Sequence, residues 1–327
     1  MSKPHIFAFA VILAFWLDSQ WGEPPSRFHP VVWMGNYLRW AGERVAPLAD
    51  AINVAAQNVR AFALGVTAWL AGAIGVVCMA WAIQSLGLML AGYGWLATVL
   101  ATLLLGLALK PMFAWRMLRD EVQGVEEALG KSLQAGRERL GWLVSRDVTT
   151  LTETQVRESA IESLAENLND SVVAPIFWFV VLGLPGAALY RFANTADAMW
   201  GYHGARNGRV WEWAGKWAAW ADDVLSWVPA RITAALLAMV AGGVPMAALR
   251  CEARRTPSPN SGWPMAAMAL GLGVCLHKPG AYALNSSGRP VQAADTSLAI
   301  GYALKVVFVY IIIASLAILL VAIEEAP

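Results

Sequence analysis

The sequence predicts an all-α, polytopic membrane protein with about four to six membrane segments, some of them broken or re-entrant. Of its 327 residues, 58% are hydrophobic and only 14% are charged, whereas a soluble domain carries about 25% charged residues. Several apolar runs reach the roughly 20 residues that a helix needs to cross a bilayer. Many of the 17 Trp lie at the ends of these runs, where a membrane interface favours them.

Composition also excludes some classes of protein. The net charge is +1, so no basic field points to nucleic acid, and membrane lipid is the expected surrounding partner. The three cysteines are scattered without a CxxC spacing. They therefore predict neither a disulfide framework nor a zinc site.

We expect one integral membrane domain over residues 1–327. A short N-terminal membrane-associated helix (6–17) comes first, and the hairpin 61–109 should turn at Gln84 and Ser85. The other predicted parts are a cytoplasmic helical segment (110–171), broken membrane segments with a motif loop (172–249), a cytoplasmic loop (250–305) and a C-terminal transmembrane helix (306–323). The positive-inside rule places 110–171 and 250–305 in the cytoplasm.

The segment after the first helix, LDSQWGEPPSRFHPVVWMG, is rich in ionisable groups. Pro24 and Pro25 fix an extended chain there. Asp18, Glu23 and His29 lie within or beside this rigid stretch. It is either a plain interfacial loop or a substrate-binding loop, and its fixed geometry favours binding.

A stripe of acids follows the polar middle of the chain. Thr152 with Gln155 forms a capping-box pattern, which predicts a helix from about residue 153. Carboxylates then recur every fourth residue, at Glu158, Glu162, Glu166 and Asp170. Neighbours at that spacing share a helix face and repel, and the helix has no Lys or Arg placed to relieve the second and third of them. The stripe is a solvated face or a site for Mg²⁺ or an ammonium group.

Two later apolar segments are interrupted. The segment 172–190 contains Pro175 and the GLPG motif, and the segment 232–249 contains GGVP. If both are re-entrant, the polar loop 191–226 shares the cytoplasmic face; if both cross fully, it lies on the opposite face. The prolines of RRTPSPNSGWP exclude a helix over residues 254–264.

Six ordered blocks resemble one family. They are GEPPSRFHPVVWMG, SRDVTTL, ESLAENLNDSVVAPIFW, GLPGAALYRFANTADAM, ADDVLSWVPARITA and SPNSGWP. Together they are similar to the CobD/CbiB family, the adenosylcobinamide-phosphate synthases of cobalamin biosynthesis. The sequence departs from the family where Trp220 replaces an Arg and Ser226 replaces an Asn.

The resemblance implies a multi-pass inner-membrane ligase with cytoplasmic active-site loops. Such enzymes join adenosylcobyric acid to (R)-1-amino-2-propanol or its O-phosphate through an amide bond, and they consume ATP. The corrinoid and the amino alcohol would be its small-molecule partners, and other corrin-pathway enzymes its protein partners. The sequence has no P-loop, so ATP is implied by the resemblance alone.

Two other classes stay open. One is a transporter, although its charges should lie within the spans, whereas here they flank them. The other is a non-catalytic membrane sensor like the AmpE relatives of the family. Such a sensor would not need HPVVWMG, AENLND and ADDV together.

The proposed chemistry assigns a role to each polar block. Mg²⁺ prefers carboxylate oxygens, and Arg clamps phosphate. The candidate metal ligands are Glu162, Glu166, Asp170, Asp197, Asp222 and Asp223. The candidate catalytic residues are His29 as a general base, Arg146, Asp147 and Arg231. The candidate substrate-binding residues are Asp18, Glu23, Asn167, Asn194, Ser258 and Asn260.

Overall fold

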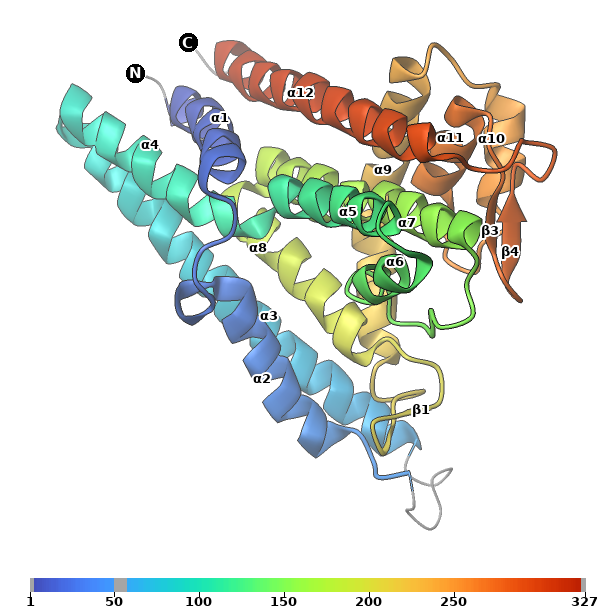
Figure 1. Ribbon diagram of the computed structural model, residues 1–327. Helices are drawn as coiled ribbons and strands as arrows, with labels where there is room; N and C mark the ends of the chain where they lie inside the picture. The colour runs from blue at the N-terminus through green and yellow to red at the C-terminus, as the bar shows by residue number, and fades with distance from the viewer. Residues whose placement is uncertain (1–2, 50–57, 325–327) are drawn as a thin grey trace. The chain divides into compact units, whose positions relative to one another are not determined.

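The structure is a computed structural model that describes residues 3–49 and 58–324. It confirms the all-α prediction, because the β-strands in that part of the chain form just two short hairpins (Figure 1). The α-helices are α1 (Lys3–Trp21), α2 (Pro30–Val45), α3 (Asn58–Leu90), α4 (Trp95–Leu109), α5 (Trp115–Leu129), α6 (Leu133–Leu140), α7 (Glu153–Leu168), α8 (Ala174–Trp200), α9 (Lys216–Val240), α10 (Met246–Ala253), α11 (Gly262–Leu272) and α12 (Ala293–Glu324). The strands are β1 (Ala205–Arg206), β2 (Arg209–Val210), β3 (Leu276–Lys278) and β4 (Tyr282–Leu284).

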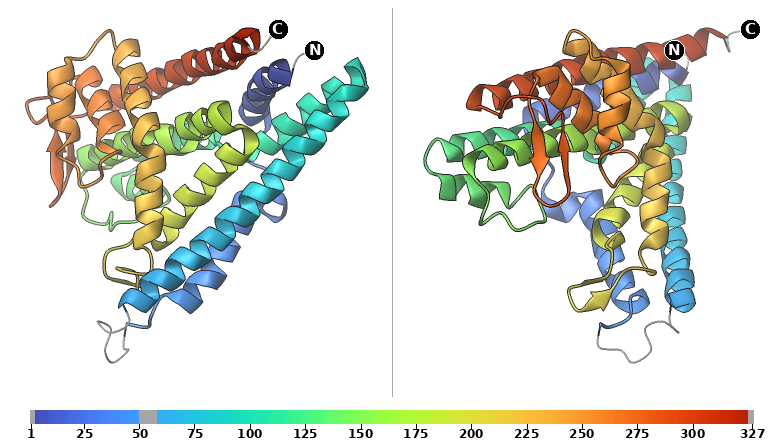
Figure 2. Two further views of the ribbon diagram at one scale, coloured as in Figure 1. Left: turned by 180° about the vertical axis from the view of Figure 1, so that it is seen from behind. Right: turned by 90° about the vertical axis from the view of Figure 1, so that its right-hand side faces the viewer.

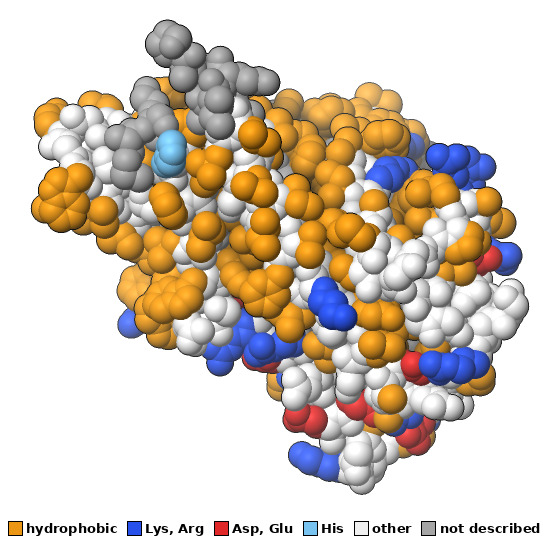
Figure 3. All heavy atoms as spheres, turned by 90° about the horizontal axis from the view of Figure 1, so that it is seen from above, with side chains coloured by type: hydrophobic (Ala, Val, Ile, Leu, Met, Phe, Trp, Pro, Cys, Tyr) orange, Lys and Arg blue, Asp and Glu red, His pale blue; other side chains and the backbone are white. Residues whose placement is uncertain are grey.

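Five helical stretches are long and apolar enough to cross a membrane, within the predicted range. They are Asn58–Tyr93, Trp95–Leu129, Glu153–Trp200, Lys216–Val240 and Ala293–Leu320. Large hydrophobic side chains on them are exposed, among them Ile74, Trp81 and Leu100. Hydrophobic side chains also cover broad areas of the face shown in Figure 3. This surface is suited to lipid.

The chain folds into two compact units. Unit 1 comprises Met1–Phe113, Pro175–Leu225 and Ala314–Pro327, and unit 2 comprises Ala114–Ala174 and Ser226–Ile313. Each unit has its own group of polar residues, so the units are described separately.

In unit 1, α1 packs on α4 and α2 packs on α3 (Figures 1 and 2). Small residues allow the first contact: a Cβ at Gly106 of α4 would come within 2.6 Å of the Leu13 side chain of α1. The second is fixed by the Tyr37 hydroxyl, which donates to the Ala68 carbonyl at 2.7 Å. The hydroxyl is thereby satisfied among apolar helices.

The turn of the transmembrane hairpin was predicted in the wrong place. Helix α3 continues through Gln84 and Ser85, and the chain turns at Ala91–Tyr93 and Gly94, which has φ of 120°. The polar Gln84 serves another purpose: its side-chain oxygen accepts the backbone N–H of Leu184 at 2.8 Å. That bond lies where Gly183 (φ 69°) interrupts α8.

The interruptions at GLPG and GGVP are confirmed, because α8 kinks at Gly183 and α9 ends at Val240 before α10 begins at Met246. The loop predicted over residues 191–226 is shorter than expected. Helices α8 and α9 extend into it, and residues 201–215 with the hairpin β1–β2 connect them. Several predicted site residues therefore lie on helices.

Pro175 is accommodated without breaking the helical path. A π-helix, Asn169–Val173, precedes it. Pro175 has no N–H for the carbonyl of Ser171, four residues earlier. That carbonyl instead accepts the N–H of Ala114 at 2.9 Å, so the start of α5 is tied to the π-helix.

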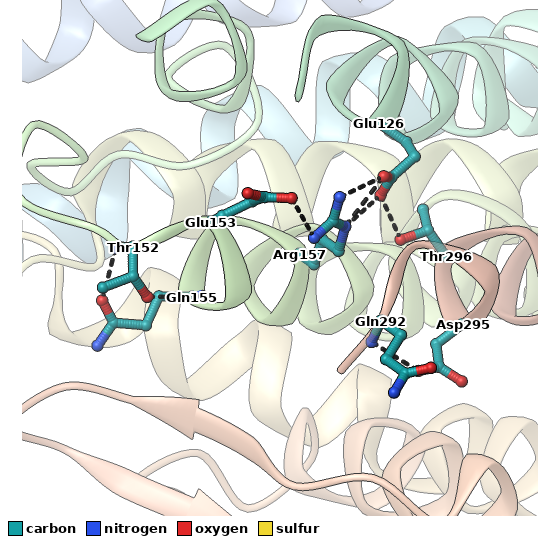
Figure 4. Close-up of polar contacts among 8 residues, drawn as sticks. All are labelled: Glu126, Thr152, Glu153, Gln155, Arg157, Gln292, Asp295 and Thr296. Atoms are coloured by element: carbon teal, nitrogen blue, oxygen red, sulfur yellow. Dashed lines mark hydrogen bonds and ion pairs between the residues drawn. The ribbon is translucent and has the colours of Figure 1, made fainter. Parts of the chain in front are cut away.

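In unit 2, α7 begins as predicted. Thr152 and Gln155 form a complete capping box before Glu153. Arg157 of α7 donates to both carboxylate oxygens of Glu126 of α5, and Thr296 of α12 donates to the same carboxylate at 2.9 Å (Figure 4). One carboxylate thus joins three helices.

The prediction that residues 254–264 contain no helix is wrong for the last three of these residues. Helix α11 begins at Gly262, and Pro264 is its third residue. The first N–H groups of a helix have no partner within it. A proline in the first turn therefore removes no intrahelical hydrogen bond.

Candidate functional site

A polar cavity of about 270 Å³ lies in unit 2. Helix α7, the segment after α6 and the hairpin β3–β4 contribute its walls. Its charged and polar lining includes Arg146, Glu162, Glu166, Asn167, Lys278 and Tyr282. The first four of these were predicted site residues.

In the described part of the chain, the guanidinium group of Arg146 has protein partners at one nitrogen only. Its Nη2 donates to the Ser159 hydroxyl and lies 3.6 Å from Oε2 of Glu162. Its Nε and Nη1 atoms are buried and have no hydrogen-bond partner among the described residues. A buried donor without an acceptor is costly, so this guanidinium favours an anion in the cavity.

Cations from outside α7 reduce the repulsion between the carboxylates of the acidic stripe. The spacing of residues within the helix could not show these cations. Arg146 pairs with Glu162, and Lys278 of β3 lines the same cavity. Burial raises the pKa of the Tyr282 phenol, and the carboxylates of Glu162 and Glu166 raise it further. Tyr282 therefore stays a neutral hydrogen-bond donor beside these acids.

Three neighbouring predicted residues have local roles. Asn167 donates to the Ser163 carbonyl at 2.9 Å. Asp170 accepts from the Asn169 amide at 2.8 Å within the π-helix. Asp147 accepts from the backbone N–H and the hydroxyl of Thr149, which hold the pKa of its carboxyl below the ordinary value.

Arg231 lies at a second cavity of unit 2, of about 610 Å³. Its guanidinium donates to Asn260 Oδ1 at 2.7 Å, and to the carbonyls of Pro259 and Trp227. The Ser258 hydroxyl accepts the N–H groups of Asn260 and Ser261. These predicted site residues fasten the SPN loop to α9, so the donors of Arg231 are largely engaged.

Unit 1 holds a separate ionic network. The ammonium of Lys110 lies 3.2 Å from Asp18 Oδ1 and 2.9 Å from Glu23 Oε1. Asp18 is fully buried, with 0% exposure. Burial acts to raise the pKa of Glu23, but hydrogen bonds from His29 and Lys110 outweigh it and the pKa is lowered. These two candidate substrate-binding carboxylates thus hold the ammonium group of Lys110.

Both ring nitrogens of His29 are engaged. Nδ1 accepts the N–H of Val31 at 3.2 Å as the N-cap of α2, and Nε2 lies 2.7 Å from Glu23 Oε2. An accepting Nδ1 assigns the proton to Nε2, which donates to the carboxylate. A general-base role for His29, as predicted, would require one of these bonds to break.

The remaining candidates lie on α8 and α9 in unit 1. Asn194 donates to Asp222 Oδ1 at 3.3 Å, which joins the blocks NTAD and ADDV. Asp197 is on α8 and Asp223 on α9. The six candidate metal ligands are therefore divided between the units, Glu162, Glu166 and Asp170 in unit 2 and the other three in unit 1.

In residues 3–49 and 58–324, no group of three or more His, Cys, Asp or Glu is placed to hold a metal ion. Mg²⁺ commonly uses one or two carboxylates together with phosphate oxygens and water. Glu162 and Glu166, which line one cavity with Arg146, fit that donor set.

Sequence reasoning missed Lys110, Lys278 and Tyr282. A signal existed for the first: Lys110 is the one charged residue between Arg60 and Arg116. A lone cation beside an apolar hairpin needs a carboxylate partner. The other two are brought to α7 by a β-hairpin that the sequence did not predict.

The fold and its cavities define a multi-pass helical membrane protein with a cavity lined by charged side chains. The chain belongs to the CobD/Cbib protein family, which matches residues 11–320. It is 39% identical over 307 residues to a probable cobalamin biosynthesis protein CobD of Methanothermobacter thermautotrophicus, covering 90% of each chain. It is 40% identical over 291 residues to the cobalamin biosynthesis protein CobD of Stutzerimonas stutzeri, covering 86% of each. No solved structure matches the chain.

Proposed function

We propose that this protein is an ATP-dependent amide ligase of cobalamin biosynthesis. It would join a carboxylate of adenosylcobyric acid to (R)-1-amino-2-propanol or its O-phosphate at the inner membrane. Membership of the CobD/Cbib family supports the pathway. The observation that supports the reaction is the cavity in which Arg146 has two buried, unpaired donors beside Glu162 and Glu166.

The chemistry requires such a site. A carboxylate does not react with an amine at neutral pH, because hydroxide is a poor leaving group. Transfer of the γ-phosphoryl group of ATP to the carboxylate gives an acyl phosphate and ADP. The amine then forms the C–N bond as the C–O bond to phosphate breaks, and it releases a proton. Catalysis of phosphoryl transfer depends on positioning and charge neutralisation.

The residues of the cavity divide this work. Arg146 would bind phosphate oxygens with Nε and Nη1, while Ser159 and Glu162 hold its other nitrogen. Lys278 would supply a second positive charge from β3. Glu162 and Glu166 are the residues that would hold Mg²⁺, which neutralises phosphate charge when bound. The neutral Tyr282 would donate to an oxygen of the substrate.

The experiment uses the full chain purified in detergent with adenosylcobyric acid, the amine and Mg-ATP. The expected result is an amide product, detected by mass spectrometry, in equal amount to the ADP released. The variant Arg146→Ala should lose product, whereas Arg119→Ala, on an exposed part of α5, should retain it. Amide formed without ATP would exclude the proposed reaction, and equal activity of both variants would exclude this site.

A further inference from the structure

One end of unit 1 brings together two parts of the chain that are distant in sequence (Figures 1 and 2). The end of α2 and the start of α3 meet the hairpin β1–β2 and the start of α9 there. Val210 donates to the Pro47 carbonyl at 2.9 Å, and Arg209 donates to the Ala46 carbonyl at 2.7 Å. The rings of Phe62 and Trp220 join α3 to α9 with centroids 6.1 Å apart. We call residues 36–49, 58–66 and 201–220 the basic end.

The basic end carries six Lys and Arg against two carboxylates, Glu43 and Glu212. Residues 84–100, which contain the turn between α3 and α4, carry no charged side chain. The long helix α3 therefore runs from a cationic end to an uncharged one. Cationic ends of membrane helices lie on the cytoplasmic side.

Aromatic rings accompany these cations. Arg44 lies over the Trp40 ring at 4.3 Å, and Lys216 over the Trp213 ring at 4.2 Å. Trp40 and Trp220 are about half exposed, at 54% and 49%. Exposed Trp beside Lys and Arg is typical of the headgroup level of a bilayer.

A small pocket of about 130 Å³ lies between two of the arginines. Arg44 and Arg60 line it, with Pro47 and Leu64. Arg44 donates to the Trp40 carbonyl at 2.6 Å through one nitrogen, Nη1. The other nitrogens of its guanidinium group remain to donate to a ligand in the pocket. Val59, next to Arg60, is 79% exposed. Two guanidinium groups beside exposed apolar side chains match a phosphate attached to acyl chains.

We propose that the basic end binds the headgroup phosphate of an anionic phospholipid between Arg44 and Arg60, in the cytoplasmic leaflet. The guanidinium groups bind the phosphate, and exposed apolar side chains such as Val59 face the acyl chains. This site fixes the depth of α2 and α3 in the membrane. It also places residues 201–215 on the cytoplasmic side.

Lipid binding is tested with the full chain in detergent, by native mass spectrometry with phosphatidylglycerol, phosphatidylcholine or inorganic phosphate. Wild-type protein should retain phosphatidylglycerol about tenfold better than phosphatidylcholine. Arg44→Gln with Arg60→Gln should abolish the difference, while Arg119→Gln with Arg250→Gln, the same charge change elsewhere, should not. Equal retention of both lipids by wild type would overturn the proposal, whatever the variants do. Binding of inorganic phosphate as strong as that of lipid would replace the lipid with a free anion.

Sidedness is tested by cysteine labelling in a variant without native cysteines. Asn207→Cys lies in the exposed turn between β1 and β2, and Tyr93→Cys, 83% exposed in the native residue, lies at the uncharged turn. In intact spheroplasts, a membrane-impermeant maleimide should label position 93 and not position 207. Labelling of position 207 before lysis would place the basic end outside.

Discussion

The side-chain oxygen of Gln84 accepts the backbone N–H of Leu184 at 2.8 Å. The two residues are 100 positions apart, and both lie in helices suited to the membrane. Gly183 has a positive φ of 69° and interrupts α8. A hydrocarbon environment offers no water to the freed N–H, so a side chain from α3 satisfies it.

Gln84→Leu should therefore destabilise unit 1. The lost hydrogen bond leaves a buried N–H unsatisfied, which costs about 1–3 kcal/mol. The midpoint of thermal unfolding in detergent measures the effect. Ser85→Ala, one residue along the same helix, is the control and should leave the midpoint unchanged; equal midpoints for the two variants would contradict the capping role.

Glu23 should give unit 1 an acid-sensitive stability. Burial acts to raise its pKa, but hydrogen bonds from His29 and Lys110 lower it from the ordinary value of 4.5, so its charged form stabilises the fold. That contribution is present above about pH 4.5 and is lost as pH falls through the lowered pKa. Wild type should thus lose stability on acidification more steeply than Glu23→Gln, as measured by thermal unfolding between about pH 7 and pH 3. Glu43→Gln, an exposed site on α2, should follow wild type, and parallel profiles for all three would argue against the network.

Lys110 should be essential to the fold. Lys110→Met leaves the buried Asp18 without its cation, and breaking a buried ion pair costs about 3–5 kcal/mol. The second change Asp18→Asn removes the uncompensated charge, so the double variant should regain part of the lost stability. Folded yield by size-exclusion chromatography and the unfolding midpoint check both points. A double variant less stable than Lys110→Met would show that the pair is not coupled in this way.

The planar geometry of the Arg146 guanidinium group, and not its charge alone, should be needed for turnover. Arg146→Lys keeps the charge but loses the planar donors that bind phosphate in pairs. In the proposed reaction, turnover should fall by about tenfold or more, with the thermal midpoint little changed. Arg119→Lys is the matched control. Full activity in Arg146→Lys would indicate that one point charge is enough.

Tyr282 should contribute as a donor. Tyr282→Phe removes one hydroxyl and keeps the ring that packs in the hairpin β3–β4. Loss of a neutral hydrogen bond is worth about 0.5–1.5 kcal/mol, so turnover should fall by up to about tenfold. Tyr202→Phe is the control, because that hydroxyl donates within its own segment to the Ala198 carbonyl. An unchanged rate would remove Tyr282 from the reaction.

Local signals in the sequence predicted local structure well. The pair Thr152 and Gln155 marked the start of α7, because a capping box is satisfied within four residues. GLPG marked the kink in α8, because Gly183 alone tolerates that φ. The turn at Gln84 was misplaced, since a polar residue in an apolar run resembles a turn when its distant partner is unknown.

Partners across long sequence separations could not be predicted. Lys110 meets Glu23 over 87 residues, and Lys278 joins the cavity of α7 through a two-stranded hairpin. Helix periodicity describes one helix at a time, so it showed the acids of α7 but not the cations facing them. The bounds of the two interrupted apolar segments assigned the aspartates of NTAD and ADDV to a loop, whereas they lie on α8 and α9.

The place of His29 at the head of α2 has a consequence for which residues can replace it. Its Nδ1 does the work of an N-cap acceptor for Val31, a task that Asn performs at least as well. An Asn amide, however, is too short to replace Nε2 as the donor to Glu23 at 2.7 Å. The position thus needs a side chain that accepts close to the backbone and donates further out, which imidazole does and Asn, Lys and Ala do not.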